Sequence, residues 1–282
     1  SPSGDGINTY IVSQATKKAG IKVALSGLGG DELFAGYPNF LRWAKTKQGV
    51  LPKVPASLRQ YAATALAVSS NSRRRRMADL LGAPNFDLHE IYPLFRQVLS
   101  ETNVVEYLGK KQVTVLRDTL EEKASAIGDY PLLSQFSIAE IVGYTQNVLL
   151  KDTDQYSMAS ALEVREPFFD YKLIEYVLRI PDELKYPKYP KSLLVESLSP
   201  LLPQEIVHRR KMGFVLPWDQ WMRNELREFC AVRIERLAAR GIVNSERLQT
   251  NWKNFLSGSG GVTWSQMWHL VVLSDWLDTN GF

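Results

Sequence analysis

The sequence has 282 residues, of which 45% are hydrophobic and 23% charged, so it is long and apolar enough for a globular protein of one or two domains. Its 34 basic and 30 acidic residues leave a net charge of +4, too small a bias to indicate nucleic-acid binding. The single cysteine, Cys230, excludes an internal disulfide framework and fits a reducing compartment, so we expect a cytoplasmic protein. No apolar run approaches the roughly 20 residues that cross a bilayer, which argues against a membrane span.

The N-terminal residues predict a helix followed by a strand. Ile7, Tyr10, Ile11 and Ala15 share one stripe at helical spacing over residues 5–19, and Gly20 suits a left-handed cap. The apolar run 21–25 then predicts a buried strand. Since a lone strand cannot form a stable sheet and the rest of the sequence offers few candidates, we expect the other strands to precede residue 1. The start of the chain, which has neither a methionine nor a signal-peptide pattern, is expected to be a fragment boundary.

A glycine-rich turn with two acids follows the strand. The segment combines a hydroxyl, three glycines and two carboxylates, namely Ser26, Gly27, Gly29, Gly30, Asp31 and Glu32. Glycines let a backbone approach a ligand closely, and carboxylate oxygens are ligands that Mg²⁺ prefers. At the carboxyl end of a parallel strand, this turn predicts a phosphate and metal site. The alternative is a structural turn in which Asp31 caps the next helix and Glu32 interacts with its dipole.

After Tyr37 the sequence is dominated by helical patterns. They cover residues of about 55–69, 72–82, 110–127, 131–149 and 262–278, with glycine and proline turn signals between them. The four arginines 73–76 open one of these helices and are expected to form a solvated face. This part of the chain therefore predicts a mostly helical structure.

Two later segments carry further candidates. Residues 151–170 contain Asp154 in an acidic, small-residue run, followed by Glu163 and Arg165, which we expect to form a structural ion pair. Lys211 lies two residues before a glycine and could bring a cation to a pocket edge, although a surface lysine is the simpler alternative. The three histidines, His89, His208 and His269, lack the spacing of a zinc site or a catalytic triad.

Together, these segments resemble the C-terminal synthetase domain of glutamine-dependent asparagine synthetases. The chain contains Ser-Gly-x-Gly-Gly-Asp-Glu-Leu-Phe-x-Gly-Tyr from Ser26, Asp-x-x-Ser-Met-Ala-x-x-Leu-Glu-x-Arg-x-Pro-Phe-x-Asp from Asp154, and Arg-x-Lys-x-Gly-Phe-x-x-Pro from Arg209, in that order. The resemblance covers residues 1–225 as the C-terminal part of such a domain. Residues 226–282 match more loosely and are expected to form a helical extension packed on the same domain.

The resemblance implies a parent α/β domain of the adenine nucleotide α-hydrolase-like, ATP-pyrophosphatase type, of which this chain is a mostly α-helical fragment with about one parallel strand. By this resemblance, the family's glutaminase domain and phosphate loop are expected to lie outside the 282 residues. The implied partners are ATP, Mg²⁺, aspartate or another carboxylate, ammonia from glutamine and the N-terminal glutaminase domain, and a homodimer is left open. The implied reaction is adenylation of the carboxylate with release of pyrophosphate, followed by displacement of AMP by ammonia.

The motif matches also imply roles for individual residues. Ser26 and Gly27, with Leu28, Gly29 and Gly30, would contact the nucleotide, and Asp31 would hold Mg²⁺ and pyrophosphate. Asp154 would lie near the acceptor or the intermediate. Lys211 would neutralise charge that develops on the pyrophosphate, as expected for a cation beside a leaving phosphate.

The sequence departs from the family in two places. Leu28 stands where asparagine synthetases have a glutamate tied to the adenylate, and leucine can neither bind an amine nor accept a proton. A different acceptor therefore stays open, as in β-lactam synthetases or cell-envelope amidation. Glu166 and Phe169 also differ, and we attribute them to packing variation. A non-catalytic helical interaction module is the alternative from another functional class.

Overall fold

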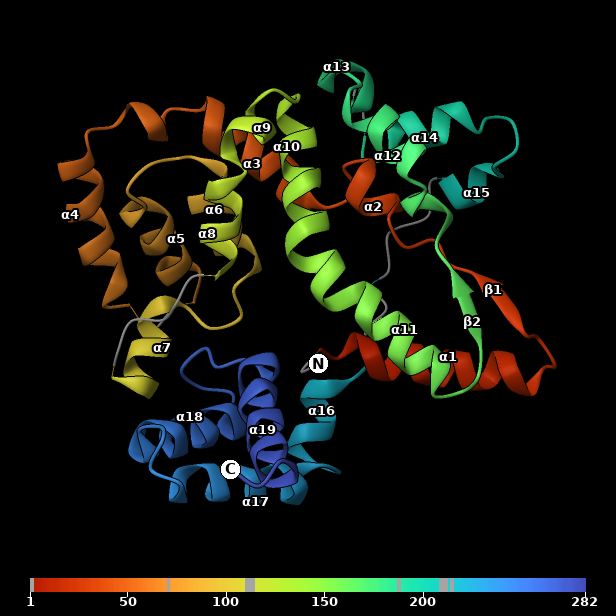
Figure 1. Cartoon of the computed structure of the whole chain (residues 1–282). Coiled ribbons are helices and arrows are strands. Elements are labelled where there is room, and N and C mark those ends of the chain that lie inside the picture. Colours follow the sequence, from red (N-terminus) through yellow and green to blue (C-terminus); the bar gives the residue numbers. More distant parts are fainter. Residues whose placement is uncertain (1–2, 70–71, 110–114, 187–188, 208–212, 214–215) are drawn as a thin grey trace.

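The described parts of the chain are mainly helices joined by short loops (Figure 1). The computed structural model describes all residues except 1–2, 70–71, 110–114, 187–188, 208–212 and 214–215. In chain order, the elements of the first half are α1 (Asp5–Lys18), β1 (Val23–Leu25), α2 (Gly30–Leu33), α3 (Pro38–Gln48), a 3₁₀ turn (Leu51–Lys53), α4 (Ala56–Ala67), α5 (Ser72–Gly82), α6 (Leu88–Arg96), α7 (Glu101–Leu108), α8 (Val115–Glu122) and α9 (Ala124–Gly128). Those of the second half are α10 (Leu132–Ala139), a π-helix (Glu140–Leu149), α11 (Leu150–Met158), β2 (Glu163–Arg165), a 3₁₀ turn (Pro167–Phe169), α12 (Tyr171–Leu178), α13 (Asp182–Lys185), α14 (Ser192–Ser197), α15 (Gln204–Val207), α16 (Trp218–Arg223), α17 (Arg227–Ala239), α18 (Ser245–Ser257) and α19 (Trp264–Thr279).

The mostly helical character is confirmed, and so are several predicted elements. α1, α4, α5 and α19 begin and end close to the expected bounds, and Gly20 adopts a left-handed φ of 84° just after α1. The predicted helix over 131–149 continues through the π-helix into α11 and forms a long rod across the molecule (Figure 1). Among the described residues, no helix is both long and apolar enough to cross a bilayer.

The apolar stripe of α1 is not its most buried face. Tyr10 and Ile11 are 37% and 49% exposed, whereas Gly6, Asn8 and Ser13 are buried. The reason is a close approach to α11, since a Cβ at Gly6 would lie 2.2 Å from the Tyr156 ring. α1 therefore packs on α11 with its small and polar face, while Tyr10 and Ile11 of the stripe stay exposed and Ile7 packs against the C-terminal apolar cluster.

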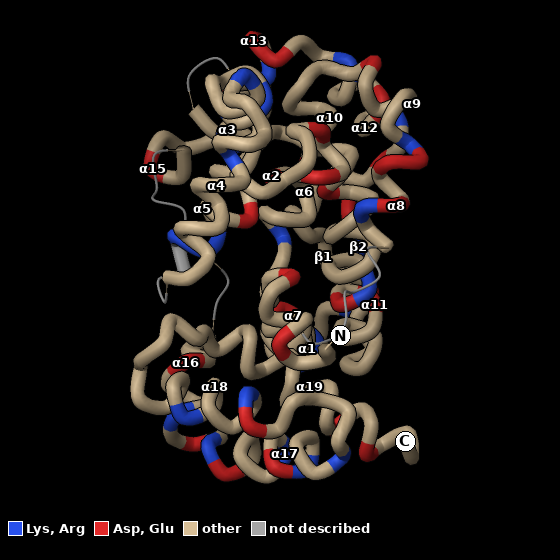
Figure 2. Tube along the Cα trace, turned by 90° about the vertical axis from the view of Figure 1, so that its left-hand side faces the viewer, with Lys and Arg blue, Asp and Glu red and all other residues tan. Residues whose placement is uncertain are grey.

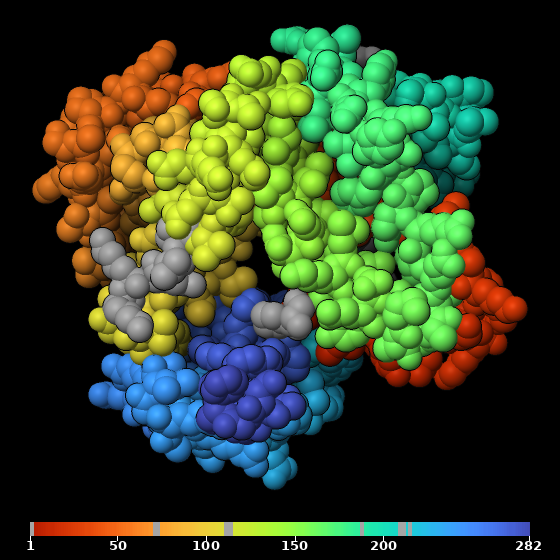
Figure 3. All heavy atoms as spheres, viewed as in Figure 1, coloured from red at the N-terminus to blue at the C-terminus, as the bar shows by residue number. Residues whose placement is uncertain are grey.

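The expectation of a single strand is corrected to a parallel pair. β1 pairs with β2 in the register Val23 with Glu163, Ala24 with Val164 and Leu25 with Arg165. The sequence predicted an ion pair between Glu163 and Arg165 but no strand there. The pair does form, with Arg165 Nε 2.7 Å from Glu163 Oε1, but it lies on this short strand. The two strands lie with α1 at one edge of the molecule (Figure 1), where the first residues form the red margin of the space-filling view in Figure 3.

Two large apolar clusters hold the helices together. In the first, Phe136 on α10 lies edge-on to Phe40 of α3, with ring centroids 4.7 Å apart, and to Tyr92 of α6, at 5.3 Å. The second joins α16 to the C-terminal helices through Trp218, whose ring lies 4.6 Å from Trp268 and 5.8 Å from Trp264. The buried Cys230 belongs to this second cluster, as expected for a structural cysteine. Figure 2 shows acidic and basic residues interspersed along the chain.

A lysine is buried where α13 meets α10. The Lys185 side chain is fully buried, and its ammonium donates to the Ser134 hydroxyl. Burial lowers the pKa of Lys185 from its usual 10.5 to about 8, and the nearby Asp182 opposes this shift. The ammonium form of Lys185 is therefore disfavoured in the folded chain.

This burial predicts a pH-dependent stability. Between pH 8 and pH 10.5 the unfolded chain keeps the Lys185 proton that the folded chain releases, so the fold gains stability as pH rises. Between pH 8 and pH 10.5, the unfolding free energy of wild type should rise on the order of 3 kcal/mol more than that of Lys185→Met. Urea unfolding at several pH values measures the difference, with Lys253→Met on the exposed face of α18 as the matched control. A constant difference between wild type and Lys185→Met across the window would contradict the account.

Candidate functional site

The candidate site lies where β1 and β2 end. Both strands run in the same direction, so the segments that follow them leave the sheet at one edge. The Ser26 N–H continues the pairing beyond β1 and donates to the Arg165 carbonyl at 2.9 Å. Residues 26–30 and the segment that begins with Glu166 are therefore neighbours in space. This is the edge at which parallel sheets bind ligands.

The turn after β1 is shaped by its glycines. The Leu28 N–H donates to the Ser26 hydroxyl at 3.1 Å, which tightens the turn. Gly29 has a φ of 97°, and a Cβ there would lie 2.8 Å from the Phe168 Cβ, so no other residue fits without rearrangement. By contrast, a Cβ at Gly27 would meet nothing within 4 Å. The backbone at Gly27 consequently faces open space that a ligand can enter.

Glu32 braces the turn from inside. Its side chain is buried, and its Oε2 accepts from the Gly29 N–H at 3.0 Å while its Oε1 accepts from the Tyr37 hydroxyl at 2.8 Å. Burial is the largest cause of a raised Tyr37 pKa, and the negative charge of Glu32 is the next, so Tyr37 stays protonated and donates. Glu32 is therefore a structural acid of the turn, whereas Asp31 beside it points elsewhere.

Asp31 faces a lysine from a distant part of the chain. Its Oδ1 lies 2.9 Å from the Lys191 ammonium, and its side chain remains 22% exposed. A Cβ at Gly36 would lie 1.9 Å from this same oxygen, so the loop after α2 forms a close cradle around the carboxylate. Lys191 itself has a φ of 62°, unusual for a side-chain-bearing residue, and its N–H donates to the Phe34 carbonyl at 3.1 Å. Residues held in sparsely populated backbone conformations cluster at functional sites.

A buried ion pair connects the turn to the central rod. The Arg96 guanidinium forms two hydrogen bonds with the fully buried Glu140 carboxylate, one of them 2.9 Å long from Nε to Oε1. It also lies over two rings, 5.5 Å from the centroid of Tyr37 and 4.1 Å from that of Tyr144. Burial raises the pKa of the Glu140 carboxyl, and Arg96 opposes that rise. Arg96 thus compensates the acid and supports Tyr37 from behind.

The structure brings together some of the predicted residues but not all. Ser26, Leu28 and Asp31 are half-buried in one turn, with Gly29 and Gly30 buried and Gly27 exposed. Asp154 is exposed on α11, and no hydrogen bond or ion pair with a described residue joins its side chain to the turn. Lys211 lies outside the described residues. Lys191 was not predicted, because its link to Asp31 spans 160 positions and no local pattern marks it.

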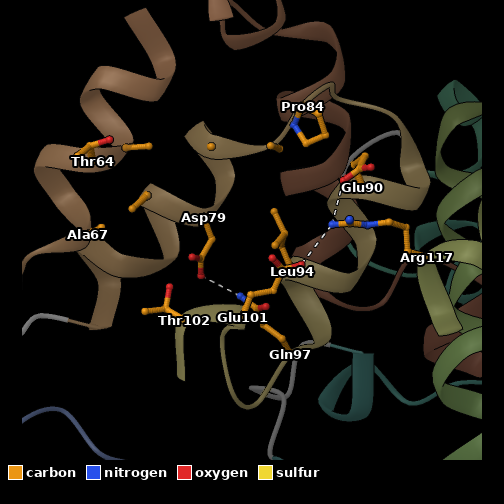
Figure 4. Close-up of a pocket in the computed structure, with 14 residues that line it drawn as sticks. Thr64, Ala67, Asp79, Pro84, Glu90, Leu94, Gln97, Glu101, Thr102 and Arg117 are labelled. Carbon is orange, nitrogen blue, oxygen red and sulfur yellow. Dashed lines mark hydrogen bonds and ion pairs between the residues drawn. The ribbon is translucent and has the colours of Figure 1, made fainter. Parts of the chain in front are cut away.

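A separate cavity of about 390 Å³ lies between α4, α5, α6 and α8 (Figure 4). Arg117 points toward Glu90, at 3.1 Å, and Glu101, at 3.4 Å, while Asp79 accepts from the Gln97 amide at 3.0 Å. The charged walls of this cavity therefore largely satisfy one another. None of the predicted site residues lines it.

No group of three or more histidine, cysteine or acidic residues that could hold a metal ion occurs within the described parts of the chain. Asp31 is a single carboxylate in a glycine-lined cradle. That arrangement fits Mg²⁺, which is commonly bound through one or two carboxylates together with substrate phosphates.

Comparison with known proteins shows that the sequence matches a protein family. The family model described as asparagine synthase matches residues 3–278. A glutamine-hydrolysing asparagine synthetase of Bacillus subtilis is 27% identical over 231 residues, covering 79% of this chain and 35% of the relative. A putative glutamine-hydrolysing asparagine synthetase of Mycobacterium bovis is 25% identical over 284 residues, covering 95% of this chain and 40% of the relative.

More distant similarity extends to an amidase, chry2, of Gibberella zeae, which is 23% identical over 259 residues, covering 78% of this chain and 36% of the relative. No solved structure matches significantly. The chain spans about two fifths or less of the length of the relatives cited here.

The Arg96 pair predicts a large loss of stability on substitution. Arg96→Met leaves the Glu140 carboxylate buried without its partner and should cost about 3 to 5 kcal/mol of unfolding free energy. Adding Glu140→Gln removes the buried charge and should recover part of that loss.

Urea unfolding measures both variants. Arg236→Met is the matched control, because it removes only the largely exposed pair with Asp278 and should cost less than about 1 kcal/mol. A loss below about 1 kcal/mol for Arg96→Met would show that the pair does not support the turn.

Proposed function

The chain belongs to the asparagine synthase family, and from that premise we propose that it supplies one side of the active site of an ATP-dependent amidotransferase. In this proposal the protein adenylates a carboxylate with release of pyrophosphate, and ammonia derived from glutamine then displaces AMP. Activation is needed because a carboxylate is a poor electrophile. The observation that carries the proposal is the open, glycine-lined turn at the carboxyl edge of a parallel strand pair, with the Asp31 carboxylate beside it.

The turn accounts for the nucleotide side of the reaction. Ser26 and Gly27, together with residues 28–30, would contact the nucleotide. The open space at Gly27 supports this role. Asp31 would hold Mg²⁺, which neutralises phosphate charge, and Glu32 would keep the turn in shape through Gly29 and Tyr37.

The acceptor side is assigned by resemblance. Asp154 would lie near the acceptor or the acyl-adenylate, and Lys211 would neutralise charge on the leaving pyrophosphate. Aspartate is the acceptor that the family favours. Because Leu28 cannot bind an amine or accept a proton, a non-aspartate carboxylate is the second candidate.

The exposed edge of the molecule supports a larger sheet in the complete protein. Leu25 on β1 is 74% exposed and Val23 is 43% exposed, although parallel strands normally have both faces covered. Tyr10, Ile11 and Val12 on α1 continue this apolar surface. We propose that strands outside these 282 residues cover it and carry the phosphate loop, and that a glutaminase domain supplies the ammonia.

In the proposed organisation, residues 1–225 contribute the site and residues 226–282 pack on them. Two hydrogen bonds support this packing. The Asn244 N–H donates to the Tyr107 carbonyl at 2.8 Å, and the Asn251 amide donates to the Tyr107 hydroxyl at 2.6 Å.

Substitution of the two charged residues tests the proposed chemistry. In the full-length protein, Asp31→Ala and Lys211→Ala should each slow pyrophosphate release by roughly 2 to 4 kcal/mol of activation free energy, the range seen for preorganised charge stabilisers. A pyrophosphate-release screen against a panel of carboxylic acids identifies the acceptor on which they are measured. Asp129→Ala and Lys151→Ala are matched controls, since both residues are exposed and lie outside the turn.

Wild-type rates in both Asp31→Ala and Lys211→Ala would remove these residues from the mechanism. Release of pyrophosphate from none of the acids by the wild-type protein would instead favour a non-catalytic helical interaction module.

A further inference from the structure

One half-buried acid at the candidate site has no hydrogen-bond partner for its carboxyl oxygens. Glu166 directly follows β2 and therefore lies at the edge of the sheet from which the Ser26 turn also leaves. Both of its carboxyl oxygens are buried, and neither has a hydrogen-bond partner. Burial raises the pKa of the Glu166 carboxyl, and the Ser26 hydroxyl, which lies close enough to lower it, offsets only part of that rise.

An unsatisfied buried carboxylate weakens a fold, so its presence needs an explanation. Two buried acids near the turn are compensated, Glu32 by Gly29 and Tyr37, and Glu140 by Arg96. Packing alone would be served better by an apolar side chain. The position of Glu166 beside the ligand turn indicates that its missing partner is a ligand group.

The charge of the site limits what that group can be. Phosphates at the turn are anionic and would be repelled by Glu166, so the nucleotide's phosphate chain does not supply the partner. Mg²⁺ is already assigned in the proposed function to Asp31, the carboxylate beside the turn. A protonated amine needs a carboxylate, and such a charge-assisted hydrogen bond is among the stronger ones in proteins.

Apolar neighbours make the position selective. Phe168 and Phe169 pack against Gly29, and Leu28 in the same turn adds no charge. In such an apolar setting, a hydrogen bond between an amine and Glu166 is stronger than it would be in water. A methylene in place of the amine leaves the carboxylate unpaired.

We propose that Glu166 binds the protonated amine of the acceptor and so selects carboxylates that also carry an ammonium group. The inference rests on the proposed adenylation of a carboxylate and adds the substrate class. It places an acid directly after the second strand, at the edge of the sheet from which the turn with the apolar Leu28 also leaves. Glu166 is then a specificity-determining residue and takes no part in proton transfer.

Pairs of acceptors that differ only in the amine test this inference in the full-length protein. Pyrophosphate release is measured with aspartate against succinate and with glutamate against glutarate. Wild type should prefer the amine-bearing acid of each pair. Glu166→Gln should raise the KM for that acid by about tenfold or more. The KM for the acid without an amine, the KM for ATP and the shape of the pH profile of kcat should stay unchanged.

Glu163→Gln is the matched control, because Glu163 lies on the same strand but is exposed and paired with Arg165. It should leave every KM unchanged. A thermal melt adds a readout apart from activity: Glu166→Gln should melt at or above the wild-type temperature at pH 7.5, since it removes a buried charge.

Five results would overturn the inference. A wild-type protein that releases pyrophosphate equally with both members of each pair excludes amine selection, whether or not the variant folds. An equal loss with both members in Glu166→Gln indicates a structural role, and a raised KM for ATP indicates nucleotide binding. Unchanged kinetics in Glu166→Gln leave the proposed function standing without this residue. No release from any acid by wild type would overturn the proposed function and this inference with it.

Discussion

The parallel pairing of β1 with β2 is the constraint on which the candidate site depends. Only three residues of each strand take part, yet their common direction brings two segments about 140 positions apart to one edge. The hydrogen bond from Ser26 to Arg165 fixes the start of the turn, and Glu166 follows on the other strand. Without this register, Ser26, Asp31 and Glu166 would have no reason to be near one another.

Buried polar groups then hold the turn against the helical body. Glu32 joins Gly29 to Tyr37, and Arg96 lies behind Tyr37 and pairs with Glu140 at the start of the π-helix. The Tyr144 hydroxyl, in the same helix, donates to Asp5 on α1 at 3.1 Å. Such networks rigidify when each member is satisfied. In this network Glu32 and Glu140 have partners, whereas the carboxyl oxygens of the neighbouring Glu166 have no hydrogen-bond partner.

The sequence predicted the elements that depend on local pattern. The helix before β1, the glycine turn and the Gly20 cap follow from helical spacing and glycine chemistry, and the structure confirms them. β2 was missed because Glu-Val-Arg is too short, and its ends too charged, to stand out as a strand. The apolar stripe of α1 did not indicate the side that packs on α11. That side is set by the close contact of Gly6 with Tyr156, which residue spacing cannot reveal.

Long-range partners were equally beyond the reach of the sequence. Lys191 meets Asp31 only because the loop after α2 and the start of α14 share a hydrogen bond, from Lys191 N–H to Phe34. Glu166 was attributed to packing, since nothing in its neighbours along the chain tells that its oxygens are buried and unpaired. Family resemblance supplied the chemistry, and Lys211, which lies outside the described residues, rests on it alone.

The central claim is that the Ser26 turn serves an adenylation. Its most direct test follows an oxygen atom in the full-length protein. When the carboxylate attacks the α-phosphate and ammonia later displaces AMP, one carboxylate oxygen stays with the AMP. An acceptor labelled with ¹⁸O in its carboxylate should therefore give ¹⁸O-labelled AMP during turnover, as read by mass spectrometry. Label in inorganic phosphate, or amide formation with unlabelled AMP, would contradict the account.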